Sequence, residues 1–162
     1  MATLDSIDQK ILRLLQEDAK LNVKDIAIRL NLTKTPIYER IKKLEREGVI
    51  DKYVAIVNRK KLTPSILVFI SGKLEVSRFE QTEEFYDGIM KLPEVIDCYL
   101  MSGEYDFLLK VMVKDLDDYH EFYAKQLSQV PRVSYVSTSF VLNEVKRSTI
   151  LPDLNEKKAL RM

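Results

Sequence analysis

Residues 33–48 read "TKTPIYERIKKLEREG", and their spacing predicts a helix with two different faces. Ile37, Ile41 and Leu44 follow the i, i+4, i+7 interval that places side chains on one face of a helix. Lysine and arginine residues are concentrated on the other side. The apolar stripe anchors this helix to its neighbours, and the basic face points outward.

Pro36 starts this helix and does not interrupt it. Whether Thr33 or Thr35 is the N-cap residue, Pro36 lies in the first turn, where backbone N–H groups have no partner within the helix. Gly48 predicts the C-terminal end, because glycine readily adopts the left-handed conformation that ends many helices.

Two further helices are predicted before it, in residues 4–18 and 22–30. They read "LDSIDQKILRLLQED" and "NVKDIAIRL", with an Asp or Ser in the first and Asn22 in the second as N-cap candidates. Their apolar stripes consist of Ile7, Ile11, Leu14 and Leu15, and of Val23, Ile26, Ala27 and Leu30. Asn31 allows a sharp turn afterwards, because asparagine tolerates the left-handed conformation.

A helix, a tight turn and a second, basic helix form the helix-turn-helix pattern, whose second helix enters the major groove of DNA. The alternative is a solvated charged face on an ordinary three-helix cluster. The preceding helix at the right distance and the small polar residues that begin residues 33–48 favour DNA. The charge distribution agrees: residues 1–60 hold 13 Lys and Arg against 9 Asp and Glu, and residues 61–162 hold 13 against 16.

The composition and the apolar runs exclude several classes of protein. The single cysteine, Cys98, excludes an intramolecular disulfide framework and fits a reducing compartment. The longest apolar run, "ILVFI", is too short to span a bilayer, and the N-terminus does not resemble a secretory signal. We therefore expect a cytoplasmic protein that does not contact a membrane.

The segment after the basic helix alternates apolar and polar residues. Residues 49–62, "VIDKYVAIVNRKKL", predict a small β-ribbon, and "NRKKLTP" at residues 58–64 reads as a linker. Its basic residues either contact phosphate or mark a hinge.

From Ser65 the apolar period becomes that of strands, and the order βαββαβ emerges. Strands are expected within residues 65–76, 94–101, 106–113 and 132–142, and helices within 78–92 and 115–130. The expected apolar stripes of these helices are Phe79, Tyr86 and Ile89, and Leu116, Tyr119, Tyr123 and Leu127. This order is the ferredoxin-like arrangement, with both helices on one face of an antiparallel sheet.

Two of these strands carry apolar residues on both faces. "ILVFI" places Ile66, Val68 and Ile70 on one face and Leu67 and Phe69 on the other. Two helices cover only one side, so the second face needs another surface, and an identical sheet supplies it most simply. The alternative, that the N-terminal helices fold back over the sheet, is less favoured because of the basic linker. We expect a homodimer.

The hairpin "MSGEYDFLL" at residues 101–109 has two interpretations. It is a plain turn, in which Gly103 permits the bend and Asp106 accepts a backbone hydrogen bond. Alternatively, its N–H groups bind a carboxylate and Asp106 binds an ammonium group, in a small pocket at a subunit boundary.

No catalytic or metal-binding pattern is present in the sequence. His120 is the sole histidine, and no Cys/His cluster, glycine-rich phosphate loop or complete Ser/His/Asp set occurs. We expect no cofactor, no metal and no enzymatic activity.

Four quoted segments together resemble the Lrp/AsnC (feast/famine) family of transcriptional regulators. They are "LDSIDQKILRLLQEDAK", "TKTPIYERIKKLEREGVI", "SGEYDFLLKV" and "FVLNEVKRS", and the resemblance covers residues 4–150. It implies an α+β protein: a winged-type helix-turn-helix domain (1–52), a β-ribbon or linker (53–64), a ferredoxin-like βαββαβ effector domain of the RAM type (65–150) and a C-terminal tail (151–162).

The resemblance also implies the function and the partners. It implies sequence-specific binding to double-stranded DNA, with the oligomeric state or the DNA binding responding to an amino acid or a related small molecule. It implies dimers through the sheets, which assemble into tetramers, octamers or larger rings.

The residues expected to serve these functions form two groups. DNA is expected to contact Thr33, Lys34, Thr35, Pro36, Tyr38, Glu39, Lys42, Lys43 and Arg46. By the resemblance, the effector is expected at Gly103, Glu104, Tyr105 and Asp106, and by position on the last strand at Thr138, Ser139 and Phe140. Family members carry Ser where this chain has Thr33, and "STSF" at residues 137–140 identifies no particular ligand.

Two competing functions share this architecture. Siroheme decarboxylases resemble it but use histidine and basic residues in the second domain, whereas this chain has a lone His120 in acidic surroundings. A sensor that never binds DNA is disfavoured by the outward basic residues of 33–48.

Overall fold

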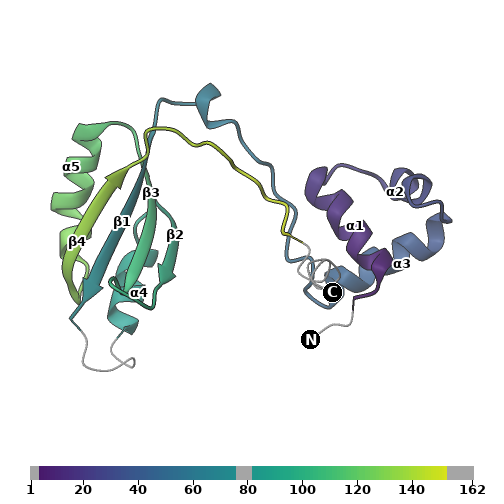
Figure 1. Ribbon diagram of the computed structural model, residues 1–162, viewed down its shortest axis with the longest axis horizontal. Coiled ribbons are helices and arrows are strands. Elements are labelled where there is room, and N and C mark those ends of the chain that lie inside the picture. The colour runs from purple at the N-terminus through teal and green to yellow at the C-terminus, as the bar shows by residue number, and fades with distance from the viewer. Residues whose placement is uncertain (1–3, 76–81, 153–162) are drawn as a thin grey trace, which may run out of the picture. The chain divides into compact units, whose positions relative to one another are not determined.

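The computed structural model describes residues 4–75 and 82–152, which form two separate compact units (Figure 1). The first unit comprises Met1–Ile56 and Lys146–Met162, and the second comprises Val57–Val145. The chain therefore returns to the first unit after Val145, and the amide of Leu151 donates to Gln16 Oε1 at 2.8 Å. By their contacts, residues 146–150 group with the helices of the first unit.

The first unit contains the three predicted helices. They are α1 (Ser6–Glu17), α2 (Val23–Arg29) and α3 (Lys34–Arg46). Asp5 and Asn22 cap the first two through their side chains, as predicted. Asn31 and Gly48 adopt left-handed φ angles of 53° and 68°, which confirms the predicted turn and helix end. The buried core of this unit consists of Ile11, Ile26, Ala27, Ile37, Ile41 and Leu44.

The β-ribbon predicted after α3 is not formed. Residues 51–58 contain no strand, and Arg59–Lys61 form a single 3-10 turn, η1. A two-stranded ribbon is only marginally stable by itself, so it needs a further strand or a helix to pack against. Among the described residues, every strand belongs to the four-stranded sheet of the other unit. The apolar side chains of Val54 and Ile56 are accordingly exposed.

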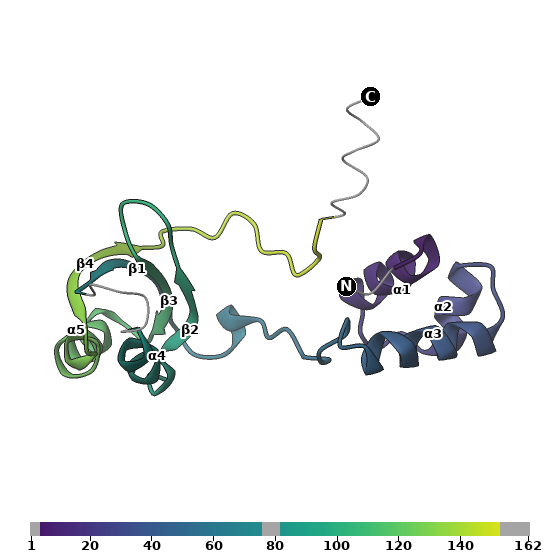
Figure 2. The ribbon, with the colours of Figure 1, turned by 90° about the horizontal axis from the view of Figure 1, so that it is seen from below.

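The second unit confirms the βαββαβ order. Its elements are β1 (Ile66–Leu74), α4 (Glu83–Met90), β2 (Val95–Leu100), β3 (Phe107–Val113), α5 (Leu116–Lys125), η3 (Leu127–Gln129) and β4 (Val133–Phe140). The strands form one sheet in the order β2-β3-β1-β4, and every neighbouring pair is antiparallel. Figure 2 shows both helices on the same side of this sheet.

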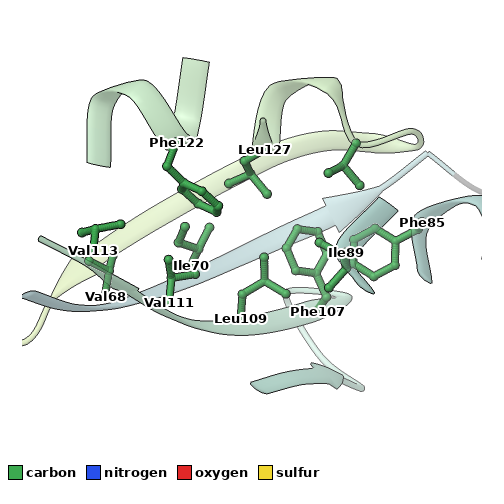
Figure 3. Packing of buried hydrophobic residues seen from close by; sticks show 11 residues of the cluster. Val68, Ile70, Phe85, Ile89, Phe107, Leu109, Val111, Val113, Phe122 and Leu127 are labelled. Carbon is green, nitrogen blue, oxygen red and sulfur yellow. The ribbon is translucent and has the colours of Figure 1, made fainter. Parts of the chain in front are cut away.

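The helices cover the sheet through a core of aliphatic and aromatic side chains (Figure 3). The ring centroids of Phe85 and Phe107 lie 4.9 Å apart. Phe122 of α5 and Leu127 of η3 reach toward the strands. The stripe predicted for α5 is partly wrong, because Leu116 and Tyr123 are exposed and Phe122 is buried.

The error has a local cause. Leu116 is the first residue after the N-cap Asp115, and α5 ends at Lys125, so Leu127 lies on a separate 3-10 turn. In α4, Ile89 is buried as predicted, Tyr86 is half-buried, and the predicted Phe79 lies outside the described residues.

Neither α4 nor α5 covers the opposite face of the sheet, which is partly apolar; we call it the helix-free face because no described helix of the second unit lies on it. The register places Leu67 beside Met112, and Phe69 between Lys110 and Ser139, on this helix-free face. Val68 and Ile70 point to the other face and are completely buried in the core. The prediction that β1 is apolar on both faces is therefore confirmed. No helix within residues 4–75 or 82–152 combines the length and hydropathy that a bilayer crossing requires.

Candidate nucleic-acid interface and ligand hairpin

α3 buries one face and leaves the predicted DNA contacts in solvent. Its three apolar anchors, Ile37, Ile41 and Leu44, are at most 7% exposed. All nine predicted DNA-contacting residues are exposed: Thr33, Lys34, Thr35, Pro36, Tyr38, Glu39, Lys42, Lys43 and Arg46. The periodicity of the sequence therefore separated the two faces of this helix correctly.

The N-terminal end of α3 suits an anionic partner. Thr33 is the N-cap residue, and its side chain makes no capping hydrogen bond. The first turn contains no acidic residue, so the partial positive charge of the helix end is not neutralised. Backbone N–H groups at such an end bind phosphate readily.

The basic residues of α3 are not equally available. Lys42 Nζ lies 2.7 Å from Glu45 Oε2 and 5.9 Å from the centroid of the Tyr38 ring. The hydrogen bond to Glu45 raises the pKa of Lys42, and the same bond lowers the pKa of Glu45. The hydroxyl of Tyr53 also donates to Glu45, at 3.1 Å. Lys42 is thus partly neutralised.

Lys43 and Arg46 have no such neighbour. In the part of the chain that the structure describes, neither residue forms an ion pair. These two side chains therefore offer their full charges to an anion.

Arg40, another basic residue of α3, forms an ion pair with α1 that the sequence did not predict. Its Nη1 lies 2.6 Å from Asp5 Oδ2 and 2.6 Å from Asp8 Oδ1, at the start of α1. The pKa of Asp5 is lowered, first by the N–H of Asp8 and then by Arg40. The spacing places Arg40 at the edge of the apolar stripe, three residues after the buried Ile37, but it does not identify the carboxylates that Arg40 contacts.

The β2–β3 hairpin is held against the end of β1. The amide of Met101 donates to the Asp106 carbonyl, and the amide of Asp106 donates to the Gly72 carbonyl, both at 2.8 Å. The side chain of Asp106 accepts a 2.8 Å hydrogen bond from the Leu74 amide through Oδ2. Gly103 has a φ of +146°, which favours glycine. The Asp106 carboxylate therefore stabilises the hairpin through its hydrogen bond to Leu74, whether or not it also binds a ligand.

The aromatic side chain of the hairpin crosses to β4. The rings of Tyr105 and Tyr135 are stacked, with centroids 6.3 Å apart and an interplanar angle of 9°. Tyr135 is paired with Lys73 in the register and lies on the helix-free face of the sheet. The remaining hairpin candidates, Gly103 and Glu104, are exposed.

The three β4 candidates do not all join the hairpin within one chain. Ser139 lies on the helix-free face, beside Phe69. Thr138 and Phe140 lie on the other face, where Tyr119 of α5 contacts both. The Tyr119 hydroxyl is 2.5 Å from Thr138 Oγ1, and its ring meets Phe140 edge-on at 5.0 Å. One chain therefore divides the three β4 candidates between the two faces of the sheet.

No residue cluster suggests metal chemistry in residues 4–75 and 82–152, where no group of three or more His, Cys, Asp or Glu side chains is arranged to bind an ion. His120 is exposed on α5.

Two family models match the chain. The winged helix-turn-helix DNA-binding model matches residues 4–51, and the Lrp/AsnC ligand binding domain matches residues 67–151.

Two similar proteins come from Escherichia coli K12. The DNA-binding transcriptional activator DecR is 37% identical over 149 residues, which span 92% of this chain and 98% of that protein. The leucine-responsive regulatory protein is 37% identical over 148 residues, which span 91% and 90%.

Two similar solved structures are also transcriptional regulators. A transcriptional regulator of Neisseria meningitidis in complex with L-Met superposes with a TM-score of 0.88 at 31% identity, covering 95% of this chain and 99% of that one. An AsnC family regulator of Agrobacterium tumefaciens superposes with a TM-score of 0.86 at 37% identity, covering 92% and 97%.

Proposed function

Because the chain belongs to the Lrp/AsnC family of transcriptional regulators, we propose that α3 docks in the major groove of an operator, under the control of an amino acid bound at the β2–β3 hairpin. The chain is a DNA-binding transcriptional regulator, and its second unit carries the ligand-binding domain of the family. The docking helix, the ligand position and the assembly are the parts that we propose.

One observation carries the DNA proposal: all nine predicted contacts lie in solvent on a helix whose opposite face is buried. Lys43 and Arg46 are the strongest candidates, because no carboxylate among the described residues pairs with their charges. Lys42 is a weaker one, because contact with DNA would compete with Glu45.

The test uses duplexes that the wild-type protein selects from a random-sequence library. Lys43→Ala and Arg46→Ala should each weaken binding by about 1–3 kcal/mol if a base contact is lost. Loss of a phosphate contact should instead flatten the salt dependence by about one unit. Lys10→Ala is the matched control, because Lys10 is an exposed basic residue on α1. Unchanged binding by both α3 variants would refute this placement of the helix.

The footprint tests symmetry as well as contact. A dimer should protect two half-sites separated by about one helical turn of DNA or a multiple of it. A single protected half-site would contradict binding by a symmetric dimer.

The ligand proposal rests on the chemistry of the hairpin. A zwitterion needs N–H donors for its carboxylate and an acceptor for its ammonium group, and the segment Gly103–Asp106 provides both. Thr138, Ser139 and Phe140 complete such a site only where subunits meet, since one chain separates them. The Neisseria relative binds L-Met and the Escherichia relative is named for leucine, so these amino acids are the first to test.

We propose that the helix-free face of the sheet joins two chains. Phe69 and Met112 are half-buried on this face, and Tyr135 is 52% exposed. Burying this area against a second copy removes apolar surface from water. We also propose further assembly into tetramers, octamers or larger rings, which membership of the family supports.

The relatives named above are transcriptional regulators, so we propose that the chain has no catalytic activity. Nothing in the comparisons supports the siroheme decarboxylase alternative. A regulator acts where the DNA is, which supports the cytoplasmic location. Incubation with haem should leave the visible spectrum of the haem unchanged.

A further inference from the structure

One nitrogen of Arg40 joins two helices of the first unit. Nη1 contacts Asp5 Oδ2 and Asp8 Oδ1 at 2.6 Å each, across a sequence separation of more than thirty residues. Asp8 is only 4% exposed, although its side chain is a carboxylic acid. A carboxylate in such a position needs a permanent partner, because burial without one is unfavourable.

The two carboxylates are themselves held rigidly. Asp5 Oδ1 accepts from the amides of Ile7 and Asp8 at 2.9 Å, and Asp8 Oδ2 accepts from the Asp5 amide at 3.3 Å. This capping box belongs to the first turn of α1. The guanidinium of Arg40 is therefore attached to a helix end and not to flexible surface side chains.

Arg40 lies at the edge of the proposed DNA-contacting face, between the buried Ile37 and the exposed Lys43. At about 100° per residue, Lys43 lies roughly 60° around α3 from Arg40, and Lys42 and Arg46 lie roughly 160° and 120° away. The side chain of Arg40 is 31% exposed, whereas those of Lys43 and Arg46 lie in solvent. Its charge faces two carboxylates, which leaves little attraction for a phosphate.

The other contacts between α1 and α3 restrict their relative orientation through packing, and helix packing angles scatter by about 15–20°. These contacts are apolar, through Ile11, Ile37 and Ile41, and the hydrophobic effect has no directional preference. A hydrogen-bonded ion pair, in contrast, has a preferred direction between donor and acceptor. With a helix radius of about 5–6 Å, a rotation of 10° moves surface atoms by about 1 Å. Recognition sites need to be held within about 0.5 Å and 10–20°.

We propose that Arg40 is a positioning residue, which through Asp8 and Asp5 sets the rotation of α3 about its own axis and so aims the DNA-contacting face. The inference rests on the proposed function, in which α3 reads DNA. It assigns to Arg40 a role in selectivity between DNA sequences and no contact with DNA.

The test compares Arg40→Met, which keeps the apolar stem, with Arg46→Met as the matched control on the other face. The full chain is titrated with a duplex selected by the wild type and with an unselected duplex of equal length, over a range of salt concentrations. Arg40→Met should weaken binding to the selected duplex by about tenfold, as expected when one base contact is misaligned. Its salt dependence should be unchanged, and its affinity for the unselected duplex should change less than threefold. Arg46→Met should flatten the salt dependence by about one unit.

A double-mutant cycle identifies the route of the effect. Asp8→Asn should reproduce the loss of selectivity, and Asp8→Asn/Arg40→Met should be no worse than Arg40→Met alone, because both changes break one contact. Arg40→Lys should retain most of the selectivity, because a single nitrogen makes both contacts in the wild type.

Folding is measured for each variant by circular dichroism and urea unfolding. If Arg40→Met does not fold, the pair Asp8→Leu/Arg40→Met replaces it, since apolar replacement of a buried ion pair is often tolerated. The same loss of selectivity in that folded pair supports the proposal.

Three results would overturn the positioning role. They are a flattened salt dependence in Arg40→Met, independent effects of Asp8 and Arg40, and wild-type selectivity in the apolar pair. If neither Arg46→Met nor Lys43→Ala affects binding to any duplex, the proposed docking of α3 fails instead.

Discussion

Asp106 allows the structural role of the hairpin to be separated from ligand binding. Its Oδ2 accepts a 2.8 Å hydrogen bond from the Leu74 amide, so removing the side chain affects folding whether or not a ligand binds. Asp106→Ala loses a charge-assisted hydrogen bond worth about 1.5–3 kcal/mol. For a domain the size of the second unit, this lowers the Tm by roughly 6–24 °C.

Asp106→Asn keeps an oxygen that accepts from Leu74 but removes the negative charge. The structural bond becomes a neutral one, and the loss of stability should fall to about 1 kcal/mol or less. An ammonium group, however, loses its counter-charge in both variants. Affinity for the amino acid should therefore fall by about ten- to a hundredfold in both, the equivalent of 1.5–3 kcal/mol.

Calorimetry across the twenty amino acids and urea unfolding, on wild type and both variants, make the comparison. Asp87→Asn is the control, because it removes an exposed carboxylate from α4, outside the hairpin. The expected pattern is strong destabilisation in Asp106→Ala alone, with weak ligand binding in both variants. If Asp106→Asn binds an amino acid as tightly as the wild type, the carboxylate does not hold the ammonium group and the hairpin is a structural turn.

Three further perturbations probe the rest of the chain. Gly72→Ala should destabilise the second unit by about 1–3 kcal/mol in urea unfolding, because the new methyl group overlaps both the ring of Phe107 and the backbone carbonyl of Tyr135; unchanged stability would contradict this close packing. Phe69→Asp should weaken a dimer joined through the sheets by several kcal/mol, and light scattering should then detect monomers; a wild type that is monomeric at micromolar concentration contradicts this interface. The pKa of Asp5 is held below its ordinary value of 3.8, so its contribution to stability is complete above pH 3.8 and is lost as the pH falls through the lower, folded value. Acid titration of Asp5→Asn should show a shallower loss of stability below pH 3.8 than the wild type.

The sequence alone determined the three N-terminal helices, because their determinants are local. Ile37, Ile41 and Leu44 define a buried face by spacing, and the N-cap residues Asp5 and Asn22 act on amides within three residues. The same spacing identified every exposed residue of α3 that we propose to contact DNA. The βαββαβ order was also readable, since a change of apolar period and a turn residue mark each boundary.

Only the tertiary structure decided which side chains meet across those elements. Arg40 reaches Asp5 and Asp8 over a separation that no local pattern encodes. The sheet register, not the sequence "STSF", assigns Ser139 to one face and Thr138 and Phe140 to the other.

The incorrect expectations have the same origin. The alternation in residues 49–62 suits a strand, but strands form only where another strand supplies hydrogen bonds, and none does so among the described residues. In α5, Phe122 is buried in the core and Tyr123 is exposed, although the i, i+4 spacing from Tyr119 favoured Tyr123. Helical faces follow from periodicity along one segment, whereas pairing depends on partners that are distant in the chain.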